Sequence, residues 1–216
     1  MEIYPNVFQI HQMFVNLYLV VDSTGLVLID TGLNGSKKRI LQALQVSGHS
    51  LQELKSILIT HADGDHYGGL ADLQKDSQAV AYADPVEAQA IRTGVSSRPL
   101  DPNGGLQKML FGLVAPLFKS QPGRIDANLA DGQVFPALGG LRVLSTPGHT
   151  PGHTSFYSPS SGVLFAGDSI QVLDGQPQPS GAGNTWNAAK AADSFQLQMA
   201  LKPKLILAGH STWKAN

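Results

Sequence analysis

The chain of 216 residues contains no cysteine. This absence excludes disulfide bonds, thiolate metal ligands and a cysteine nucleophile, and it fits a reducing compartment, so we expect a cytoplasmic protein. Long hydrophobic runs are also missing, because no apolar stretch approaches the roughly 18 residues that suggest a membrane span. Residues 1–30 lack the basic and apolar regions of a signal peptide. We therefore expect no membrane partner.

Charge is scarce as well. Charged residues make up 14% of the chain, compared with about a quarter in an average soluble protein. The 15 basic and 16 acidic residues nearly cancel, and no basic run is longer than 37–39. The chain therefore lacks the basic surface of a nucleic-acid-binding protein. Hydrophobic residues, at 42%, are sufficient for a buried core, and the length fits a single domain over residues 1–216.

The spacing of apolar residues predicts short strands and helices in both halves of the chain. In the first half we expect strands at 15–21, 26–29, 56–60 and 79–83, with helices at 36–46, 68–73 and 85–93. In the second half we expect strands at 141–145, 155–158, 162–166 and 205–208, a helix at 187–201 and a loop at 174–185. Two strand-rich halves with intervening helices predict packed sheets covered by helices on the outside.

Residues 84–130 predict an insertion of helices and loops that caps one edge of a sheet. Asp84 followed by Pro85 is typical of a helix start. Apolar residues then recur at helical spacing over 106–117, which predicts an amphipathic helix that either lines a pocket or only packs. Candidate pocket residues are Tyr67, Phe111, which lies off the apolar stripe of this helix, and Trp186.

Four predicted strands lead into a polar side chain of a kind that binds metal ions. The pairs are 56–60 with His61, 141–145 with His149, 162–166 with Asp168, and 205–208 with His210. Because strands of packed sheets can end at a common edge, we expect these side chains to converge. A single histidine is more often a surface or core residue, so the coincidence of four carries the hypothesis. His11 and His49 have no partner in this pattern and are expected at the surface or in turns.

The segment 60–69 holds the densest group of candidate ligands. His61, Asp63, Asp65 and His66 occur within six residues, and Gly64 allows the backbone to bend so that they can converge. An EF-hand is a poor match, because no glutamate stands at the twelfth position of such a loop. Imidazole combined with carboxylate favours zinc, iron or manganese over calcium.

The order of these motifs resembles that of the metallo-β-lactamase fold hydrolases. That family carries a His-x-His-x-Asp-His motif, a distant Gly-His, an Asp after a strand and a final Gly-His. The matching segments are 61–66, 148–149, 167–168 and 209–210, and residues 28–32 resemble the N-terminal signature of the family. The resemblance covers nearly the whole chain. It implies an α/β (α+β) fold, namely a four-layer αββα sandwich with two metal ions in the groove between the sheet edges.

The resemblance also implies a role for each motif residue. The first metal site would be held by His61, Asp63 and His149, the second by Asp65, His66 and His210, and both ions would be bridged by Asp168 and a hydroxide. His153 and Asp30 would lie behind the ligands and orient them.

Position 63 departs from the family pattern, because aspartate stands where the family has its second histidine. Asp63 raises the number of carboxylate ligands from two to three against two divalent ions. The added negative charge should make the first metal a weaker Lewis acid and favour harder cations. We expect two divalent ions, zinc first, with manganese or iron as alternatives. A second hypothesis is that Asp63 does not reach and that only one site fills.

These expectations point to metal-dependent hydrolysis of an ester, lactone, thioester or amide in a small molecule. Two ions about 3.5–4 Å apart can generate hydroxide at neutral pH and polarise a carbonyl oxygen, and the chain has no Gly-x-Ser-x-Gly nucleophile motif. Asp65 and Asp168 are the candidate catalytic residues. The alternatives are a mononuclear iron oxidoreductase similar to the persulfide dioxygenases and a non-catalytic metal-binding module. We expect the binding partner to be a small-molecule substrate. A homodimer is a further hypothesis.

Overall fold

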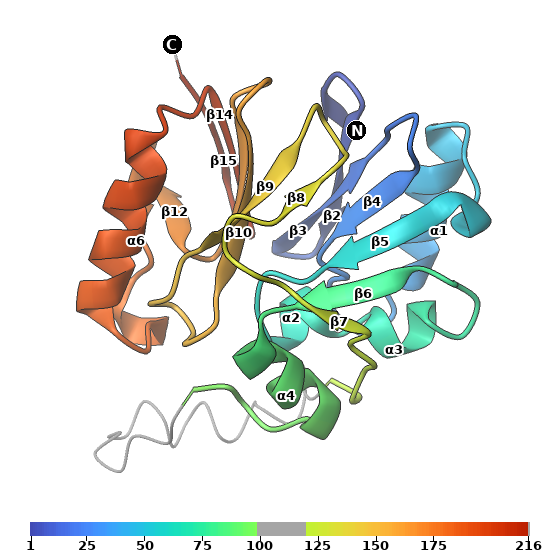
Figure 1. The fold of residues 1–216 in the computed structure, drawn as a ribbon, viewed down its shortest axis with the longest axis horizontal. Coiled ribbons are helices and arrows are strands. Elements are labelled where there is room, and N and C mark those ends of the chain that lie inside the picture. The colour runs from blue at the N-terminus through green and yellow to red at the C-terminus, as the bar shows by residue number, and fades with distance from the viewer. Residues whose placement is uncertain (99–119, 216) are drawn as a thin grey trace.

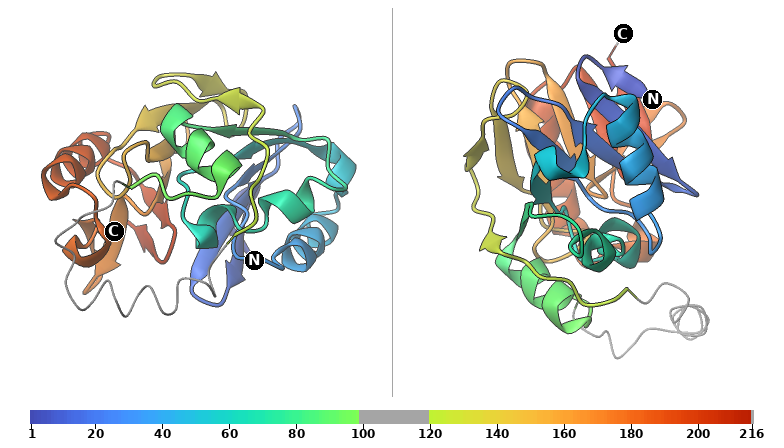
Figure 2. Two further views of the ribbon diagram at one scale, coloured as in Figure 1. Left: turned by 90° about the horizontal axis from the view of Figure 1, so that it is seen from below. Right: turned by 90° about the vertical axis from the view of Figure 1, so that its right-hand side faces the viewer.

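Two β-sheets pack face to face, and helices cover their outer faces (Figure 1). The computed structural model describes residues 1–98 and 120–215. Helices α1 and α6 lie on opposite sides of the molecule, with both sheets between them (Figure 2). This arrangement is the four-layer αββα sandwich and confirms the predicted fold class. Within the described ranges, no helix is long and apolar enough to cross a membrane.

The first sheet has seven strands in the order in which they occur along the chain. They are β1 (Glu2–Tyr4), β2 (Val7–Gln12), β3 (Val15–Val20), β4 (Leu26–Ile29), β5 (Leu54–Leu58), β6 (Val80–Ala83) and β7 (Ala127–Asn128). β1 to β4 are antiparallel, and β4 to β7 are parallel. The helices of this half are α1 (Lys37–Val46), the 3-10 helix η1 (Leu51–Glu53), α2 (Gly64–Tyr67), α3 (Leu70–Leu73) and α4 (Pro85–Thr93).

The second sheet has six strands in the order β15-β14-β11-β10-β9-β8. They are β8 (Val134–Phe135), β9 (Leu141–Ser145), β10 (Thr154–Ser158), β11 (Val163–Gly167), β14 (Leu205–Ala208) and β15 (Thr212–Lys214). A separate hairpin of β12 (Ile170–Leu173) and β13 (Gln176–Pro179) precedes the 3-10 helix η3 (Ala182–Asn184) and α6 (Ala188–Ala200). Helix α6 covers the outer face of the six-stranded sheet (Figure 1).

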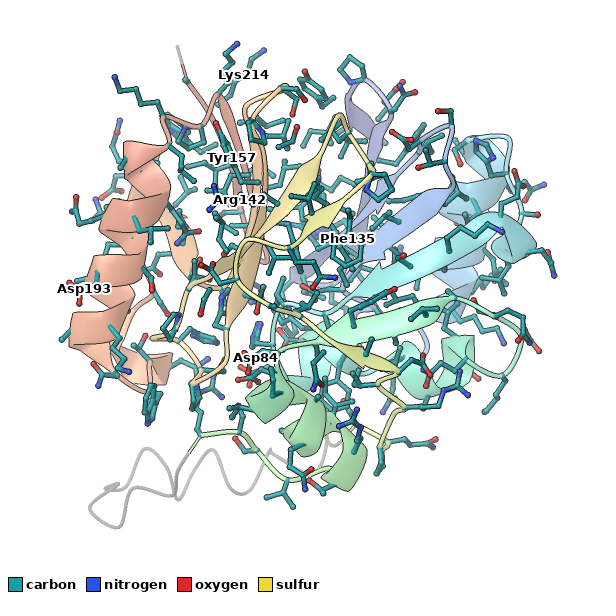
Figure 3. The ribbon with its side chains drawn as sticks, viewed as in Figure 1. Asp84, Phe135, Arg142, Tyr157, Asp193 and Lys214 are labelled. Carbon is teal, nitrogen blue, oxygen red and sulfur yellow. The ribbon has the colours of Figure 1, made fainter. Side chains whose placement is uncertain are left out.

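Three layers of buried apolar side chains hold these elements together. β3 shows how one strand serves two of them: Leu17 and Leu19 pack beneath the helices of the first sheet, whereas Tyr18 and Val20 face the other sheet. This alternation follows from the period of two along a strand. Between the sheets, the rings of Tyr18 and Phe165 meet edge to face, 5.5 Å apart. Phe135 points into the same central layer (Figure 3).

Most predicted elements are present, with end points that shift by one or two residues. The start of α4 is as predicted, because the Asp84 carboxylate accepts a hydrogen bond from the Val86 N–H and Pro85 occupies the first turn. The predicted helix over 106–117 and the candidate pocket residue Phe111 lie outside the described residues. The insertion at 84–130 overlaps that range, so its limits and the single domain stay predictions.

The loop predicted for 174–185 is wrong in part, because residues 176–179 form β13. Asp174 and Gly175 both have positive φ, 51° and 73°, the conformation that a tight two-residue hairpin turn requires. The turn brings Gln176–Pro179 alongside β12. The alternating glutamine and proline residues of β13 carry little strand propensity, so the Asp-Gly pair was the informative signal.

The direction of the strands explains where the candidate ligands go. In the first sheet, β4 and β5 are parallel neighbours, so Asp30 and Thr60, which follow them, lie side by side. In the second sheet, β11 and β14 are also parallel neighbours, and β9 runs the same way because both β9 and β11 are antiparallel to β10. All these strands therefore end toward one edge of the sandwich.

Candidate metal centre

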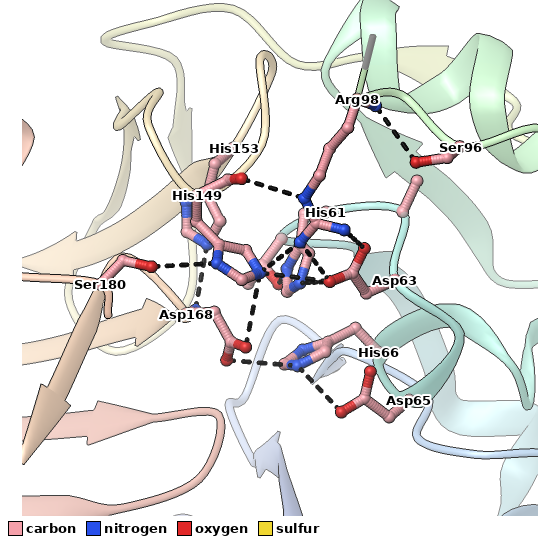
Figure 4. A network of polar contacts seen from close by, with 12 residues as sticks. His61, Asp63, Asp65, His66, Ser96, Arg98, His149, His153, Asp168 and Ser180 are labelled. Carbon is pink, nitrogen blue, oxygen red and sulfur yellow. Dashed lines mark hydrogen bonds and ion pairs between the residues drawn. The ribbon is translucent and has the colours of Figure 1, made fainter. Parts of the chain in front are cut away.

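The structure brings together all seven side chains that the sequence analysis named as metal ligands. Their ligand atoms form three overlapping groups, in each of which the atoms lie within 4.8 Å of one another. The groups are His61, Asp63 and His149; Asp65, His66 and His210; and His61, His66 and Asp168. Both sheets contribute, since 61–66 follow β5 and the other ligands follow β9, β11 and β14. Figure 4 shows the convergence of the labelled members.

The first group surrounds Oδ2 of Asp63. This oxygen lies 3.4 Å from Nε2 of His61 and 3.2 Å from Nε2 of His149. Asp63 precedes the single-turn helix α2 with an extended backbone, which turns its side chain toward the two imidazoles. The side chain that replaces the family's second histidine therefore reaches the other two candidate ligands of this group, and the number of ions stays a prediction.

The second group surrounds Oδ2 of Asp65, which lies 3.8 Å from Nε2 of His66 and 3.5 Å from Nε2 of His210. Asp168 lies between the two groups. Its Oδ1 is 3.3 Å from Nε2 of His66, and its Oδ2 is 3.1 Å from Nε2 of His210 and 3.6 Å from Nε2 of His149. One carboxylate thus faces ligands of both groups.

Every imidazole among the seven has its Nδ1 in a hydrogen bond on the side away from the cluster. The partners are the Thr60 hydroxyl for His61 at 2.9 Å, the Asp30 carboxylate for His66 at 2.8 Å, the Ser180 hydroxyl for His149 at 3.0 Å and the Phe14 carbonyl for His210 at 2.8 Å. Such partners hold the orientation of each ring, so each Nε2 is directed at the centre of the cluster.

Three buried atoms at the centre have no hydrogen-bond partner among the described residues: Nε2 of His61, Nε2 of His66 and Oδ1 of Asp168. Buried polar atoms are normally hydrogen-bonded, and an unpaired one destabilises the folded state by about 1–3 kcal/mol. All three are acceptors of the kind that coordinates zinc, manganese or iron. The residues present therefore fit divalent metal ions at both groups.

Charges within the cluster shift the pKa values of its members. Burial alone would raise the pKa of Asp168, but His66, His210 and His61 hold it well below its usual range. Burial alone would lower the pKa of His66, but Asp168, Asp65 and Asp30 raise it well above its usual range. The carboxylate of Asp168 is thus stabilised as an anion, which is the state that binds cations.

Glycines precede Asp168 and His210 for a steric reason. Gly167 has a positive φ of 51°, and a Cβ there would lie 2.7 Å from Nε2 of His153. A Cβ on Gly209 would collide with the carboxylate of Asp168 and the ring of His66. The Gly-Asp and Gly-His pairs therefore allow the strand ends to approach the cluster closely.

Comparison with known proteins is consistent with this geometry. The model of the metallo-beta-lactamase superfamily matches residues 12–210. The chain belongs to the metallo-beta-lactamase superfamily. It is similar to the Bacillus subtilis (strain 168) protein YobT, with 34% identity over 91% of this chain and 82% of that protein. It is also similar to the probable metallo-hydrolase YflN of the same organism, with 30% identity over 85% of this chain and 74% of YflN.

More distant similarities extend the comparison. The atrochrysone carboxyl ACP thioesterase of Aspergillus chevalieri is 30% identical over 72% of this chain, which covers 40% of that enzyme. A metallo-beta-lactamase family protein of Thermus thermophilus shares the fold, with a TM-score of 0.75, 24% identity, and coverage of 99% of this chain and 76% of the other. These relationships identify this member of the metallo-beta-lactamase superfamily as a hydrolase.

Asp30 and His153 lie behind the candidate ligands of this superfamily member. Asp30 accepts hydrogen bonds from the backbone and hydroxyl of Thr60 and from His66, so it supports both histidines that follow β5. His153 uses both ring nitrogens, Nδ1 with the Thr146 hydroxyl at 2.9 Å and Nε2 as acceptor for the Asp168 N–H at 3.1 Å. It therefore positions Asp168 and has no nitrogen left for a metal.

Two residues that contact the ligand loops were missed by sequence reasoning. The Glu87 carboxylate is fully buried and accepts hydrogen bonds from the backbone N–H groups of Ala62 and Gly152, one in each ligand-bearing loop. Arg98 binds Asp63 and His149. Glu87 could have been suspected because it is a charged residue on the apolar face of α4. Arg98 lies in a polar segment without a helical or strand pattern, so nothing in the sequence indicated that it contacts the candidate ligands.

The cluster opens to solvent beside His210. This side chain is 40% exposed, whereas those of His61 and His66 are fully buried. Phe14, in the turn between β2 and β3, stacks on His210 with ring centroids 5.9 Å apart and is itself partly exposed. Phe14 is therefore a candidate substrate contact that sequence reasoning also missed.

The predicted pocket residues are less clearly placed at this opening. Tyr67 is 6% exposed and packs in the core beneath the first sheet, and burial raises the pKa of its hydroxyl. Trp186 is half-buried and donates its backbone N–H to the carbonyl of His149. Their contact with substrate stays a prediction.

Proposed function

We propose that this protein is a two-metal hydrolase that cleaves an ester, lactone, thioester or amide bond of a small molecule. The observation that carries the proposal is the position of Asp168, whose two carboxylate oxygens face histidines of both ligand groups. A bridging carboxylate between two three-ligand groups is the arrangement expected of a centre for two ions. We propose zinc for both, with manganese or iron as alternatives, and a cytoplasmic location.

In this proposal, the residues around the site have three roles: they bind the ions, orient water or support the ligands. His61, Asp63 and His149 would hold one ion, Asp65, His66 and His210 the other, and Asp168 both. When bound, the ions supply Lewis acidity and activate water at neutral pH. Asp65 faces the exposed side of the cluster beside His210, where its carboxylate can accept a hydrogen bond from an attacking water and so orient it. Asp30 and His153 keep the ligands in place.

A carbonyl substrate is favoured over a phosphodiester by the charges around the site. Among the described residues, Arg98 is the one basic side chain other than histidine that contacts the ligands, and Asp63 and His149 already occupy its guanidinium. The other ion pairs of Lys and Arg among the described residues are made with Asp72, Asp76 and Asp126, none of which is a candidate ligand. The similarity to a fungal acyl-carrier-protein thioesterase supports thioesters in particular.

Hydrolysis assays test the proposal. We expect turnover on at least one of a short-chain acyl thioester, a lactone, a p-nitrophenyl ester and an anilide. Activity should fall to background after exhaustive chelation, return on adding zinc or manganese, and fall at least about a thousandfold in Asp168→Ala. His11→Ala, a change at an exposed histidine outside the cluster, is the control and should retain activity. Full turnover in both chelated protein and Asp168→Ala would overturn the proposal.

Metal analysis and oxygen consumption separate the alternatives. The proposal requires close to two metal ions per chain. One iron per chain, with oxygen consumed on a persulfide substrate, would support the dioxygenase instead. Tight metal binding without turnover on any of these substrates would support a non-catalytic module.

A further inference from the structure

Arg98 makes a forked contact with the aspartate that replaces the second histidine of the motif. Its Nη1 donates to Oδ1 of Asp63 at 2.7 Å, and its Nη2 donates to Oδ2 at 2.6 Å (Figure 4). Two further contacts go to His149, from Nε to the backbone carbonyl at 3.2 Å and from Nη2 to ring Nε2 at 2.8 Å. A single guanidinium thus contacts two of the three ligands of the first group.

These contacts divide into two kinds. Oδ1 of Asp63 and the carbonyl of His149 are outside the ligand cluster, so Arg98 can keep Nη1 and Nε bonded while a cation is held. Nε2 of His149 has one lone pair, which either Arg98 or a cation can use. Binding a cation at the first group therefore requires Nη2 to release His149, while the rest of the fork can remain on Asp63.

We propose that Asp63 and Arg98 act as one unit in which the charge of Arg98 offsets that of Asp63, so that the pair presents the first metal site with about the net charge of a neutral histidine. This inference rests on the proposed two-metal function. The sequence analysis counted three negatively charged ligands against two divalent ions and did not include a positive side chain. The contact of Arg98 with Asp63 corrects that count. Arg98 is a positioning residue here, because it acts on the cation through Asp63 and His149.

The burial of the pair makes the compensation effective. The side chains of Asp63 and Arg98 are 18% and 23% exposed, so solvent screens them only in part. The groups that face Asp63 are His61, His149 and Arg98, and Arg98 alone among them carries a fixed charge. A positive charge this close to the site repels a divalent ion, so Arg98 must weaken metal binding there.

The expected order of metal affinities follows directly. Arg98→Met removes the charge and leaves Asp63 unopposed, so the first site should bind at least about tenfold more tightly, with a larger gain for manganese than for zinc. Asp63→His leaves Arg98 unopposed, so that site should bind at least about tenfold more weakly. The double variant should return to within a few-fold of the native protein, because a neutral ligand then faces a neutral neighbour.

Two additional measurements distinguish charge from shape. Arg98→Lys keeps the charge and loses the fork, so its metal affinity should stay within a few-fold of native. In the presence of chelator, Arg98→Met should unfold at a lower temperature than the native protein, because Asp63 loses its charged partner. The double variant should recover part of that loss.

The experiment is a titration of each chelated protein with zinc, and then with manganese, against a chromophoric chelator, fitted with two binding constants. Tighter binding in Arg98→Met, weaker binding in Asp63→His and a near-native double variant are the expected results. Unchanged or weaker binding in Arg98→Met, or equal behaviour of Arg98→Lys and Arg98→Met, overturns the inference. If the native protein binds no metal at all, the proposed function fails first, and the two failures are thereby distinguished.

Discussion

Oδ2 of Asp30 lies 2.8 Å from Nδ1 of His66, on the far side of the ring from the ligand cluster. The same carboxylate accepts from the hydroxyl of Thr60, which in turn lies 2.9 Å from Nδ1 of His61. Since the hydroxyl hydrogen of Thr60 goes to Asp30, Thr60 accepts from His61. One buried aspartate therefore sets the tautomer of both histidines that follow β5, directly in one case and through a hydroxyl in the other.

Asp30→Asn should loosen this arrangement without disturbing the backbone. Asp30 has a positive φ of 59°, a conformation that asparagine also tolerates. The amide group would turn N–H donors toward either Thr60 or His66, both of which already donate. We expect metal affinity to fall by about 10–100-fold and the free energy of unfolding by about 1–3 kcal/mol.

Chelator competition and denaturant unfolding measure these two losses. Asp174→Asn is the matched control, since Asp174 also has a positive φ but is exposed in the β12–β13 turn. The control should leave both quantities unchanged. Native metal affinity in Asp30→Asn would contradict the role assigned to Asp30.

Glu87→Gln should separate the two ligand-bearing loops that this side chain joins. Each oxygen of the carboxylate accepts one backbone N–H, from Ala62 at 2.8 Å and from Gly152 at 2.9 Å. Glutamine can replace only one of these acceptors, so a buried N–H loses its partner. We expect a decrease of about 1–3 kcal/mol in the free energy of unfolding, together with faster amide hydrogen exchange at one of the two positions.

Glu2→Gln tests the same chemical change at an exposed site and should be close to neutral. Denaturant unfolding and hydrogen exchange provide the comparison. Equal stability of the two variants would show that Glu87 does not hold the loops together.

His153→Phe should release Asp168 while preserving the shape of the core. The phenyl ring fills a similar volume but cannot accept the Asp168 N–H or bond the Thr146 hydroxyl. We expect metal affinity to decrease, and the free energy of unfolding to fall by about 1–3 kcal/mol, because polar groups are left unpaired in a buried setting. His11→Phe is the control at an exposed histidine. Metal titration and denaturant unfolding of both variants measure these two quantities. Undiminished metal affinity in His153→Phe would refute the prediction.

The exposed pair of His49 and Glu53 predicts a pH effect away from the site. Hydrogen bonds from His49 and from Ser50 lower the pKa of Glu53 from 4.5 to about 2. Because this pKa is depressed in the folded state, the stabilisation is complete above the unfolded-state pKa and is lost as pH falls toward about 2. Carbon-detected NMR titration should give this low value, and His49→Ala should raise it. An ordinary Glu53 pKa in the native protein would contradict the contact.

Four of the candidate ligands could be recognised because each follows an apolar run that predicts a strand, and the resemblance to a known family implied the full set. His61, His149, Asp168 and His210 illustrate this, since the ends of β5, β9, β11 and β14 meet at one edge. Strands without a clear apolar pattern were not recognised. Among them, β7 is two residues long, and β13 consists of glutamine and proline.

Contacts made across the chain by side chains outside the motifs could not be predicted. Arg98 reaches Asp63 from 35 positions away, and Glu87 reaches Gly152 from 65 positions away. Neither separation corresponds to a helical or strand period, and both contacts depend on how α4 is placed over the edge of the sandwich. Charge compensation of this kind becomes visible only when the packing is known.

The fork of Arg98 also affects how this protein can be redesigned. Loops that shape substrate preference are usually exchanged on the assumption that a rigid scaffold keeps its catalytic centre. Here the segment after α4 sends a cationic side chain into the ligand cluster itself. Replacing that segment with another loop would remove Arg98. The metal preference of this protein would then change together with its substrate range, unless position 63 is altered in the same step.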